Sequence, residues 1–524
     1  LILSSEAGVV DIEPERVSYK GRLQPGRILL IDTKKGSIIS DEEAKTQIAA
    51  EHPYREWLDQ HLVPLETLAD VEPIAPPIDH ATILKRQQAF GYTFEDLKIF
   101  LGPMSHIGRD PLGSMGNDAP LAVLSNKPHL LYNYFKQLFA QVTNPPLDPL
   151  KEEVITSADT TIGPERNLLK PEPESCRQIR LATPIINNEE MEKLASVDQE
   201  GLRATTIPML FDAKTGDLEK AMNDLFAAAD KAIDDGYTIL VLSDRGVDQD
   251  HAPLPALLAM AGLHHYLIRE GKRTQVGIAL ESGEPREVHH FCLLIGYGAQ
   301  AINPYMAFEG LADMIAEGQL PDTEYKDAVK GYIKSATKGV IKVMAKMGIS
   351  TIKSYRGAQI FEAIGIKKDV IDTYFTWTDS RVEGIGLDVI AQEALMRHHS
   401  AYPEIPVNGS TLDVGGQYQW REDGEHHLFN PLTIHKLQHA ARSNDFDVYK
   451  EYAQMINDQS KNIGTLRGLL DLKLANEPIP IEEVESVEAI TKRFKSGAMS
   501  YGSISQEAHE ALAIAMNRLG ARSN

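Results

Sequence analysis

The chain has 524 residues, of which 42% are hydrophobic and 24% are charged, a composition typical of a globular protein. A chain of this length exceeds one ordinary hydrophobic core, so two to four domains are expected. The formal net charge of −22 argues against nucleic acid or an anionic membrane as a partner.

Cysteine usage and the absence of leader patterns bear on the compartment. The two cysteines, Cys176 and Cys292, lie far apart in the sequence, which predicts a reducing compartment without a disulfide framework. No apolar run approaches the roughly 20 residues of a transmembrane helix, and no basic-then-apolar signal peptide is present. The chain begins with Leu1 rather than Met and stops just after a predicted helix, so we expect it to be a piece of a larger protein.

The first block is predicted to be a hairpin followed by a helix. Residues 27–33 and 37–40 are strand-like runs around a turn that ends in Gly36. Ser40 and Glu43 have the spacing of a capping box, which predicts a helix toward residue 50. Such a block could not bury a core alone, so we interpret it as the tail of a preceding domain.

Residues 61–150 are predicted to be mostly irregular and helical. Prolines between 61 and 82 indicate a semi-rigid linker, and a helical pattern follows over 93–101. After the glycine-dense loop 113–118, a second helical run is predicted to reach residue 139, where prolines 145–149 prevent its continuation. Residues 150–205 have no clear pattern.

Residues 236–305 carry the strongest fold signal. Apolar strand-like runs at 237–243, 274–280 and 300–303 alternate with helical patterns at 254–268 and 286–295. Strand, helix, strand, helix, strand with short connections predicts a parallel sheet with right-handed crossovers. A (β/α) barrel and a doubly wound sheet both fit.

The remaining third is predicted to be largely helical. Helices are expected over 332–347, 431–470 and 506–519, with charged loops at 400–430. A Gly-Ser loop at 497–503 precedes the last helix.

Histidine pairs, nucleophiles and glycine loops are the candidate sites in the sequence. Adjacent histidines point to different faces, and none has an HExxH spacing or a CxxC partner, so a metal centre is not expected from these pairs: His264 and His265, His289 and His290, His398 and His399, and His426 and His427. No GxSxG elbow or N-terminal nucleophile is present. The glycine loops 113–116, 348–351 and 497–502 could contact a phosphate, or could be ordinary loop geometry.

Several unusual strings, taken together, closely resemble one family, the large subunit or ferredoxin-dependent form of glutamate synthase. The resemblance runs from end to end. The strings are 23–32 (LQPGRILLID), 113–118 (GSMGND), 135–146 (FKQLFAQVTNPP), 281–290 (ESGEPREVHH), 346–351 (KMGIST), 354–359 (SYRGAQ) and 497–505 (GAMSYGSIS).

This resemblance implies a division into three parts. Residues 1–60 are expected to be the C-terminal part of a class II glutaminase domain, without its nucleophilic cysteine. Residues 61–412 are expected to be the central domain, an α/β domain with a mainly parallel β/α sheet remotely like an FMN-type (β/α) barrel. Residues 413–524 are expected to be the start of the FMN-binding synthase (β/α)8 barrel, cut off before the iron–sulfur cysteines.

The resemblance also implies an activity for the parent enzyme, an oxidoreductase that acts on CH–NH2 groups. That enzyme makes two glutamates from glutamine and 2-oxoglutarate, with ferredoxin or an NADPH-dependent small subunit as electron source. It carries FMN and a 3Fe-4S cluster, and lies in the cytoplasm or in a plastid stroma. The fragment alone is expected to be inactive, with no cofactor bound.

Site residues follow only from matched strings. In the family, the Thr-Asn-Pro-Pro string borders the ammonia tunnel, which implies Thr143 and Asn144, although both are equally typical of helix termination. The Ala-Met-Ser string borders the flavin, which implies Ala498, Met499 and Ser500.

Two hypotheses of different classes remain open. In the first, the central domain connects the glutaminase and synthase sites and helps to form the ammonia tunnel, with no ligand of its own. The alternative is a module that retains a nucleotide or anion site near 348–357. Side chains that fill the strand ends would count against this alternative.

Overall fold

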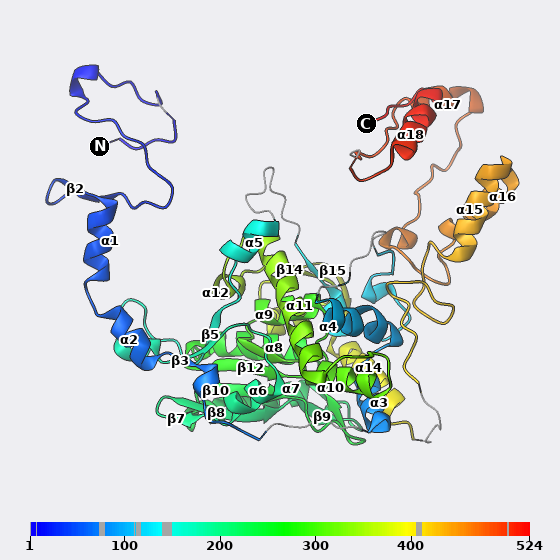
Figure 1. The fold of residues 1–524 in the computed structure, drawn as a ribbon. Coiled ribbons are helices and arrows are strands. Elements are labelled where there is room, and N and C mark those ends of the chain that lie inside the picture. The colour runs from blue at the N-terminus through cyan, green and yellow to red at the C-terminus, as the bar shows by residue number, and fades with distance from the viewer. Residues whose placement is uncertain are drawn as a thin grey trace. The chain divides into compact units, whose positions relative to one another are not determined.

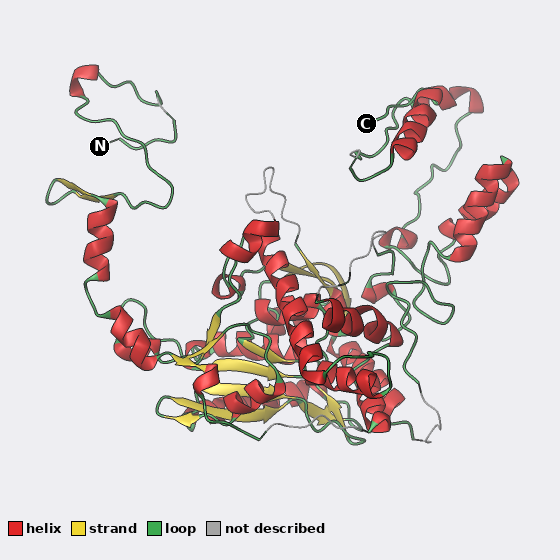
Figure 2. Ribbon diagram, viewed as in Figure 1, coloured by secondary structure: helices red, strands yellow, loops and turns green. Residues whose placement is uncertain are grey.

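The computed structural model describes residues 2–6, 8–72, 79–108, 111, 117–138, 149–404, 411–499 and 502–524. The chain divides into two compact units, Leu1–Gly468 and Leu469–Asn524. Figure 1 traces the elements of each unit in chain order, and Figure 2 distinguishes helices from strands.

The described residues of the second, small unit form two α-helices, α17 (Val487–Thr491) and α18 (Gln506–Arg518), and a 3-10 turn, η9 (Ile481–Glu483). Ser505 is the N-cap of α18, where its hydroxyl accepts a 3.3 Å hydrogen bond from the backbone N–H of Ala508. None of its described residues is buried. The unit as described therefore has no hydrophobic core of its own.

The beginning of the first unit has the predicted hairpin and helix. Strands β1 (Leu30–Asp32) and β2 (Ser37–Ile39) pair antiparallel, and Ser40 caps α1 (Asp41–Ala49) through the backbone N–H of Glu43. Helix α2 (Tyr54–His61) follows. Among the described residues up to 60, only Ala44 is buried. This block therefore does not form a core by itself.

The main sheet confirms the strand–helix alternation expected for residues 236–305. Its strand order is β13-β12-β10-β8-β7. Strands β8 (Leu202–Pro208), β10 (Ile239–Ser243), β12 (Gly277–Glu281) and β13 (Ala301–Asn303) are parallel, and β7 (Asp198–Gln199) joins β8 antiparallel. Helix α8 (Ala256–Arg269) connects β10 to β12, and α9 (Val288–Gly296) connects β12 to β13.

The first unit contains further helices and strands. The helices are α3 (His80–Ala89), α4 (Gly102–Ile107), α5 (Pro149–Ile155), α6 (Asn188–Ala195), α7 (Leu218–Asp234), α10 (Tyr305–Ala316), α11 (Tyr325–Lys346), α12 (Ile352–Tyr355), α13 (Lys368–Tyr374), α14 (Leu387–Ala401), α15 (Pro431–Ser443) and α16 (Phe446–Asn457). The other strands are β3 (Val63–Pro64), β4 (Phe135–Gln137), β5 (Thr160–Ile162), β6 (Ile179–Leu181), β9 (Leu210–Asp212), β11 (His251–Pro253), β14 (Phe361–Ile366) and β15 (Asp379–Ile385).

The fold is therefore mixed α/β, with a mainly parallel main sheet, as predicted. Smaller sheets have the orders β15-β14-β4, β3-β6-β5 and β11-β9. The strand pairings of the described residues do not join these sheets into a closed barrel. The described strands therefore form separate open sheets and no closed ring.

The helix predicted to run up to residue 139 is wrong over its described part. Residues 117–138 form two short 3-10 turns, η4 (Ala122–Leu124) and η5 (Leu131–Tyr134), followed by β4, which pairs antiparallel with β14. The reason is burial on all sides: Leu130, Leu131 and Tyr132 are consecutive and at most 5% exposed. A surface helix buries only one stripe of its residues.

The linker predicted over residues 61–82 is also wrong in its first half. Strand β3 pairs parallel with β6, and Leu65 and Leu68 are each 5% exposed. The prolines hid a short strand, because two residues are too few for a recognisable alternation. Likewise, the helix predicted over 431–470 divides into α15 and α16 at Asn444, whose φ of 53° ends α15.

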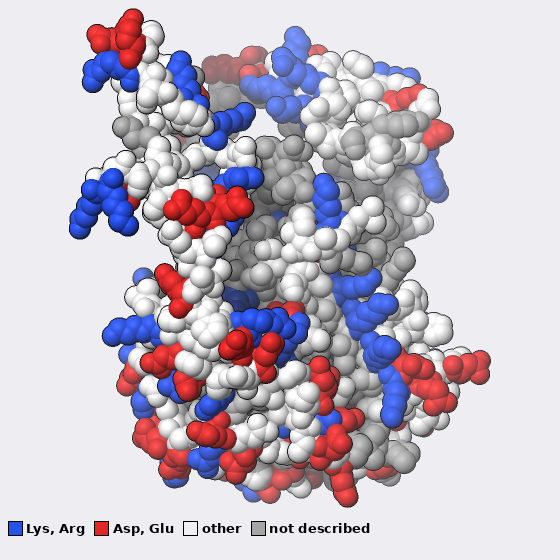
Figure 3. Space-filling model, turned by 60° about the vertical axis from the view of Figure 1, so that its left-hand side comes forward, with Lys and Arg blue, Asp and Glu red and all other residues white. Residues whose placement is uncertain are grey.

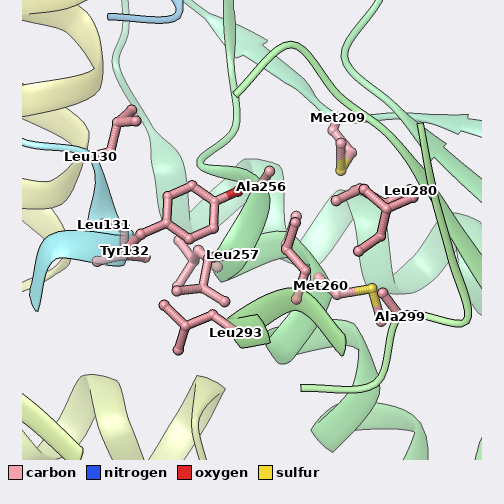
Figure 4. Close-up of a cluster of buried hydrophobic side chains, with 14 of the residues drawn as sticks. Leu130, Leu131, Tyr132, Met209, Ala256, Leu257, Met260, Leu280, Leu293 and Ala299 are labelled. Carbon is pink, nitrogen blue, oxygen red and sulfur yellow. The ribbon is translucent and has the colours of Figure 1, made fainter. Parts of the chain in front are cut away.

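The core lies where the sheet, α8, α9 and η5 meet. Figure 4 shows apolar side chains from these elements directed toward one another, among them Tyr132, Met260 and Leu280. All five residues of β10 are buried, which explains its uninterrupted apolar sequence.

The core predicts a large difference between two isoleucines on neighbouring helices. Ile295 on α9 is 0% exposed, whereas Ile268 on α8 is 51% exposed. Ile295→Ala should lower the free energy of unfolding by about 2–5 kcal/mol, because it leaves a cavity, and Ile268→Ala by less than about 1 kcal/mol. Urea unfolding followed by circular dichroism measures both, and equal losses would contradict this packing.

Candidate functional site

The carboxyl ends of parallel strands are where α/β proteins most often hold ligands. In this chain those ends carry a dense set of buried polar side chains. They come from the residues that follow β10, β12 and β13, namely Asp244, Ser282 and Tyr305. Their arrangement decides whether the sheet offers an open site.

Asp244 is the centre of this arrangement. Its carboxylate is 0% exposed and accepts hydrogen bonds from the Ser282 hydroxyl at 2.5 Å, the Tyr305 hydroxyl at 2.8 Å and the Gly283 backbone N–H at 3.0 Å. Burial raises the pKa of Asp244 to about 7, although these three donors favour the charged form. One side chain thus ties the ends of β10, β12 and β13 together.

A second group of side chains covers the outer part of the same strand ends. Glu281 accepts hydrogen bonds from the Ser243 hydroxyl at 2.6 Å and from the Arg245 guanidinium. Arg245 also lies over the Tyr305 ring, 4.0 Å from its centroid, and its second contact is Glu309 at 3.4 Å. Glu309 is in turn paired with Arg86 of α3. The strand ends are therefore filled by the chain's own charged groups.

Arg286, just before α9, connects this network to the neighbouring helical layer. Its guanidinium donates to the carbonyls of Phe90 at 3.1 Å and Gly91 at 2.6 Å, and lies 3.2 Å from Asp96. It also stacks over the Tyr92 ring, 4.2 Å from its centroid. Because Arg286 is only 4% exposed, these contacts fix α3 and the following turns against the sheet.

Residues 411–427 contact the segments that carry Glu95, Ser125, His129 and Glu287, and we call these contacts the seam. Glu95 is 7% exposed, and its carboxylate accepts hydrogen bonds from the backbone N–H groups of Gln417 at 2.7 Å, Tyr418 at 3.1 Å and Gln419 at 2.8 Å. Such a row of N–H groups is a favourable anion site. Here it is occupied by a side chain of the protein itself.

Two further acids hold the seam. The Tyr418 hydroxyl donates to Glu287 at 2.6 Å, and burial, reinforced by the nearby charge of Asp96, raises the pKa of Glu287 to about 7. Glu425 is 3.0 Å from Nε2 of His129 and accepts a 2.7 Å hydrogen bond from Ser125. Burial alone would raise the pKa of Glu425, but these hydrogen bonds lower it to about 2.

A cavity of about 410 Å³ lies between the seam and the start of α9. It is lined by charged groups of both signs, most of them already paired as described above, including Asp96, His129, Arg286, Glu287 and Glu425. Its lining includes Ser400, His129 and His290, but among the described residues no hydrogen bond joins this serine to either histidine, as nucleophilic catalysis would need. The arrangement is chemically suited to holding elements together rather than to bond breaking.

Three of the five site residues implied by the resemblance lie outside the described residues. Thr143, Asn144 and Ser500, and the loop 113–116, lie outside the described residues. Ala498 and Met499 are exposed in the loop between α17 and α18. Their roles as tunnel and flavin residues stay predictions.

The glycine loop 348–351 has an ordinary structural role, as do two of the paired histidines. Thr351 is the N-cap of α12, and its hydroxyl accepts a 3.3 Å hydrogen bond from the backbone N–H of Ser354. The His289 ring lies within 3.2 Å of the carbonyls of Tyr132 and Phe135, and His290 stacks on the Tyr132 ring at 4.2 Å between centroids. These contacts are those of packed core histidines.

Sequence reasoning missed the Asp244 network and one further group. His80, Asp313 and Glu317 place ligand atoms within 4.8 Å of one another, and His80 is 2.9 Å from Asp313. We interpret this contact as an ion pair, because the hydrogen bond to Asp313 raises the pKa of His80. The signal available for Asp244 was its place directly after a buried strand, with Ser282 directly after the next.

Comparisons with known proteins define first a class and then a family. The class II glutamine amidotransferase model matches residues 1–57. The glutamate synthase central domain model matches residues 85–367, and the conserved region in glutamate synthase matches 427–524. The chain belongs to the glutamate synthase family.

The relatives are longer than this chain. It is 52% identical to the NADPH glutamate synthase large chain of Bacillus subtilis (strain 168), covering 100% of this chain and 34% of the relative. It is 42% identical to the NADH glutamate synthase of Schizosaccharomyces pombe, with 100% and 26% covered. It is 38% identical to the chloroplastic ferredoxin-dependent glutamate synthase of Spinacia oleracea, with 100% and 33% covered. The chain thus spans about a third or less of these relatives.

A solved structure of a mutant flavocytochrome b2 with benzoylformate is 12% identical, at a TM-score of 0.30 over 64% of this chain and 98% of that chain. A likeness at this level carries no weight for fold or function. No helix among the described residues is long and apolar enough to cross a membrane.

The Asp244 network predicts a pH dependence of stability. A carboxyl in an unfolded chain loses its proton near pH 4, whereas that of folded Asp244 does so at about pH 7. Between these values the folded state binds more protons, so its stability falls as pH rises and is level above about 7. Asp244→Asn removes this component.

The free energy of unfolding of the wild type minus that of Asp244→Asn should therefore fall between pH 4 and 7, by at most about 1.4 kcal/mol per pH unit. Urea titrations at several pH values measure this difference. Asp224→Asn is the matched control, because Asp224 is an exposed partner of Lys220. A difference that is independent of pH for Asp244→Asn would contradict the assignment.

Proposed function

We propose that this chain is part of an enzyme that converts glutamine, 2-oxoglutarate and a reductant into two glutamates. We further propose that residues 61–412 are its central connecting domain, between a glutaminase part in residues 1–60 and the start of an FMN-binding synthase barrel in residues 413–524. The single observation that carries this is the order of the three family matches along one chain.

The connecting role agrees with the chemistry of the candidate site. The strand ends are closed by Asp244 and its donors, and the seam is held by Glu95, Glu287 and Glu425. In these contacts the acidic side chains hold neighbouring segments together. None of these four acids is placed as the general base of a nucleophile. A central domain that only sets the distance between two active sites needs rigidity and no catalytic set of its own.

Transfer of ammonia between the two sites requires a protected path. Ammonia released to water at pH 7 would be mostly protonated and no longer nucleophilic. We propose that Thr143 and Asn144 border this path, where small polar side chains can accept or donate a hydrogen bond to neutral ammonia. Their support is the match of the Thr-Asn-Pro-Pro string to the family.

FMN in the longer protein would supply the hydride that reduces the imine to glutamate. Ala498, Met499 and Ser500 are the residues of this chain proposed to border it. Ala498 and Met499 are exposed. The support for this proposal is the match of the Ala-Met-Ser string to the family.

The iron–sulfur cluster does not fit this chain. A cluster is held by several cysteine thiolates, whereas the chain has two cysteines, with Cys292 buried against Tyr355. We therefore expect cluster ligands beyond this sequence. The electron source, ferredoxin or an NADPH-dependent small subunit, and the compartment, cytoplasm or plastid stroma, stay proposals by resemblance.

The proposed path predicts uncoupling in the whole enzyme. Asn144→Trp should block ammonia transfer, so glutamine hydrolysis would continue while glutamate formed per glutamine consumed falls severalfold. Paired assays of glutamine loss and 2-oxoglutarate-dependent reductant oxidation measure this ratio. Asn167→Trp is the matched control in an exposed loop. An unchanged ratio for Asn144→Trp would exclude this residue from the path.

The closed strand ends predict that the 524-residue chain lacks a nucleotide site in its central domain. Titration with FMN should give no saturable quenching of flavin fluorescence. Saturable quenching that is abolished by Ser354→Trp would instead establish the alternative, a ligand-binding module near 348–357. Quenching abolished by Ser500→Trp would place the bound flavin at the synthase loop.

A further inference from the structure

Helix α11 carries an unusual row of cations. Lysines recur at every fourth position along its 22 residues, and the helix contains one acidic residue, Asp327. The six lysines are Lys326, Lys330, Lys334, Lys338, Lys342 and Lys346. Figure 3 shows acidic and basic side chains interspersed over much of one face, with basic side chains following one another in a line at one place. For a chain of net charge −22 this local excess is exceptional.

Other helices of the chain neutralise their lysines at the same spacing. Lys220 is paired with Asp224 at 2.6 Å, and Lys231 with Asp235 at 2.5 Å, each four residues on. In contrast, Lys326, Lys330 and Lys334 have no hydrogen-bond or ion-pair partner in the part of the chain that the structure describes. Like charges four residues apart destabilise a helix, so the repulsion among Lys326, Lys330 and Lys334 opposes folding.

The opposite face of α11 holds the helix rigidly in place. Tyr332 and Ala336 are 0% exposed. A Cβ added at Gly331 would lie 2.2 Å from the carbonyl oxygen of Ser105, and one at Gly339 would lie 2.3 Å from Val288. Because the backbone packs this closely against α4 and α9, α11 cannot turn its lysines toward the core.

The lysines border an open groove of about 700 Å³, which we call the α11 groove. Its apolar lining is mainly Ile185, Phe308, Val329 and Ile333, of which only Ile333 is partly exposed, and its basic edge is Lys326, Lys330, Lys334 and Lys338. Glu189 and Glu190 also line the groove, but Glu189 is paired with Lys193, and Glu190 accepts a hydrogen bond from the backbone N–H of Asn187. An apolar floor with a charged edge is the usual anatomy of a protein-recognition surface.

We propose that the α11 groove is the docking surface for a separate protein that presents an acidic, amphipathic segment. Its carboxylates pair with the lysine edge while its apolar side chains cover the partly exposed Ile333. The lysine edge indicates that the partner segment is negatively charged, and the apolar floor indicates that this segment also carries apolar side chains. The exposed lysine edge fits a reversible complex, since permanent interfaces are more apolar.

Other polyanions fit less well. A membrane-surface helix needs a broad exposed apolar face, whereas the apolar face of α11 is buried against α4 and α9. Nucleic acid would use the lysines but not the apolar floor, and it would be repelled by the net charge of the chain.

The test uses a labelled 20-residue peptide with Glu and Leu at helical spacing, titrated into the whole 524-residue chain. Fluorescence anisotropy should show saturable binding that weakens as salt rises from about 50 to about 200 mM. The variant Lys326→Gln/Lys330→Gln/Lys334→Gln should bind on the order of tenfold more weakly. The matched control, Lys214→Gln/Lys220→Gln/Lys231→Gln, changes three exposed lysines elsewhere and should change affinity less than about twofold.

Ile333→Ala should also weaken the Glu/Leu peptide more than a poly-Glu peptide of equal length, because only the former covers the apolar floor. Circular dichroism melting verifies that each variant is folded. The proposal is overturned by absent binding, by equal losses in the two triple variants, or by tighter binding of single-stranded DNA or phosphatidylglycerol vesicles than of the peptide. Self-association that requires the three lysines would also overturn it, by making a second copy the occupant.

Discussion

Closure of the strand ends by Asp244 is the interaction on which the rest of the structure depends. A buried carboxyl is unfavourable unless it is protonated or well hydrogen-bonded. The groups that donate to Asp244 belong to Ser282, Gly283 and Tyr305, which come from the segments after two neighbouring strands. Asp244 is stabilised only when all three donors are in place. This requirement fixes the relative positions of β10, β12 and β13.

This constraint extends outward through arginines. Arg245 joins Glu281 to Glu309, and Arg286 attaches the turns after α3 to the sheet. At the seam, Glu95 and Glu287 accept further hydrogen bonds from residues 417–419. A chain of paired charges thus runs from the sheet to residues 411–427. Such a layer suits the connecting role proposed above.

The sheet was predictable from sequence because its strands are short, fully buried and regularly separated by helices. The short apolar runs of β10 and β12 are typical of buried strands. The segment before β4 was not predictable, because residues buried on every side have no periodicity that distinguishes a helix from irregular structure. Strand β3 was hidden for a similar reason, since two residues next to prolines carry no alternation.

The candidate site could be predicted only in part, because its contacts join residues far apart in sequence. Glu95 meets Gln417, and His129 meets Glu425, across about 300 residues, and no local spacing encodes such pairs. Thr143 and Asn144, in contrast, came from a matched string alone and lie outside the described residues. Local pattern indicated the elements, while long-range pairing of charges determined what the strand ends can hold.

Hydrogen exchange at the strand ends tests this account most directly. The backbone N–H of Gly283 donates to Asp244, and it lies in a loop that would otherwise exchange rapidly. Mass spectrometry of native-state exchange should find residues 281–284 protected to nearly the same degree as β10, and far more than the exposed loop at Gly348. Protection of 281–284 no greater than that of the loop would show that the strand ends are open, and would contradict the closed central domain.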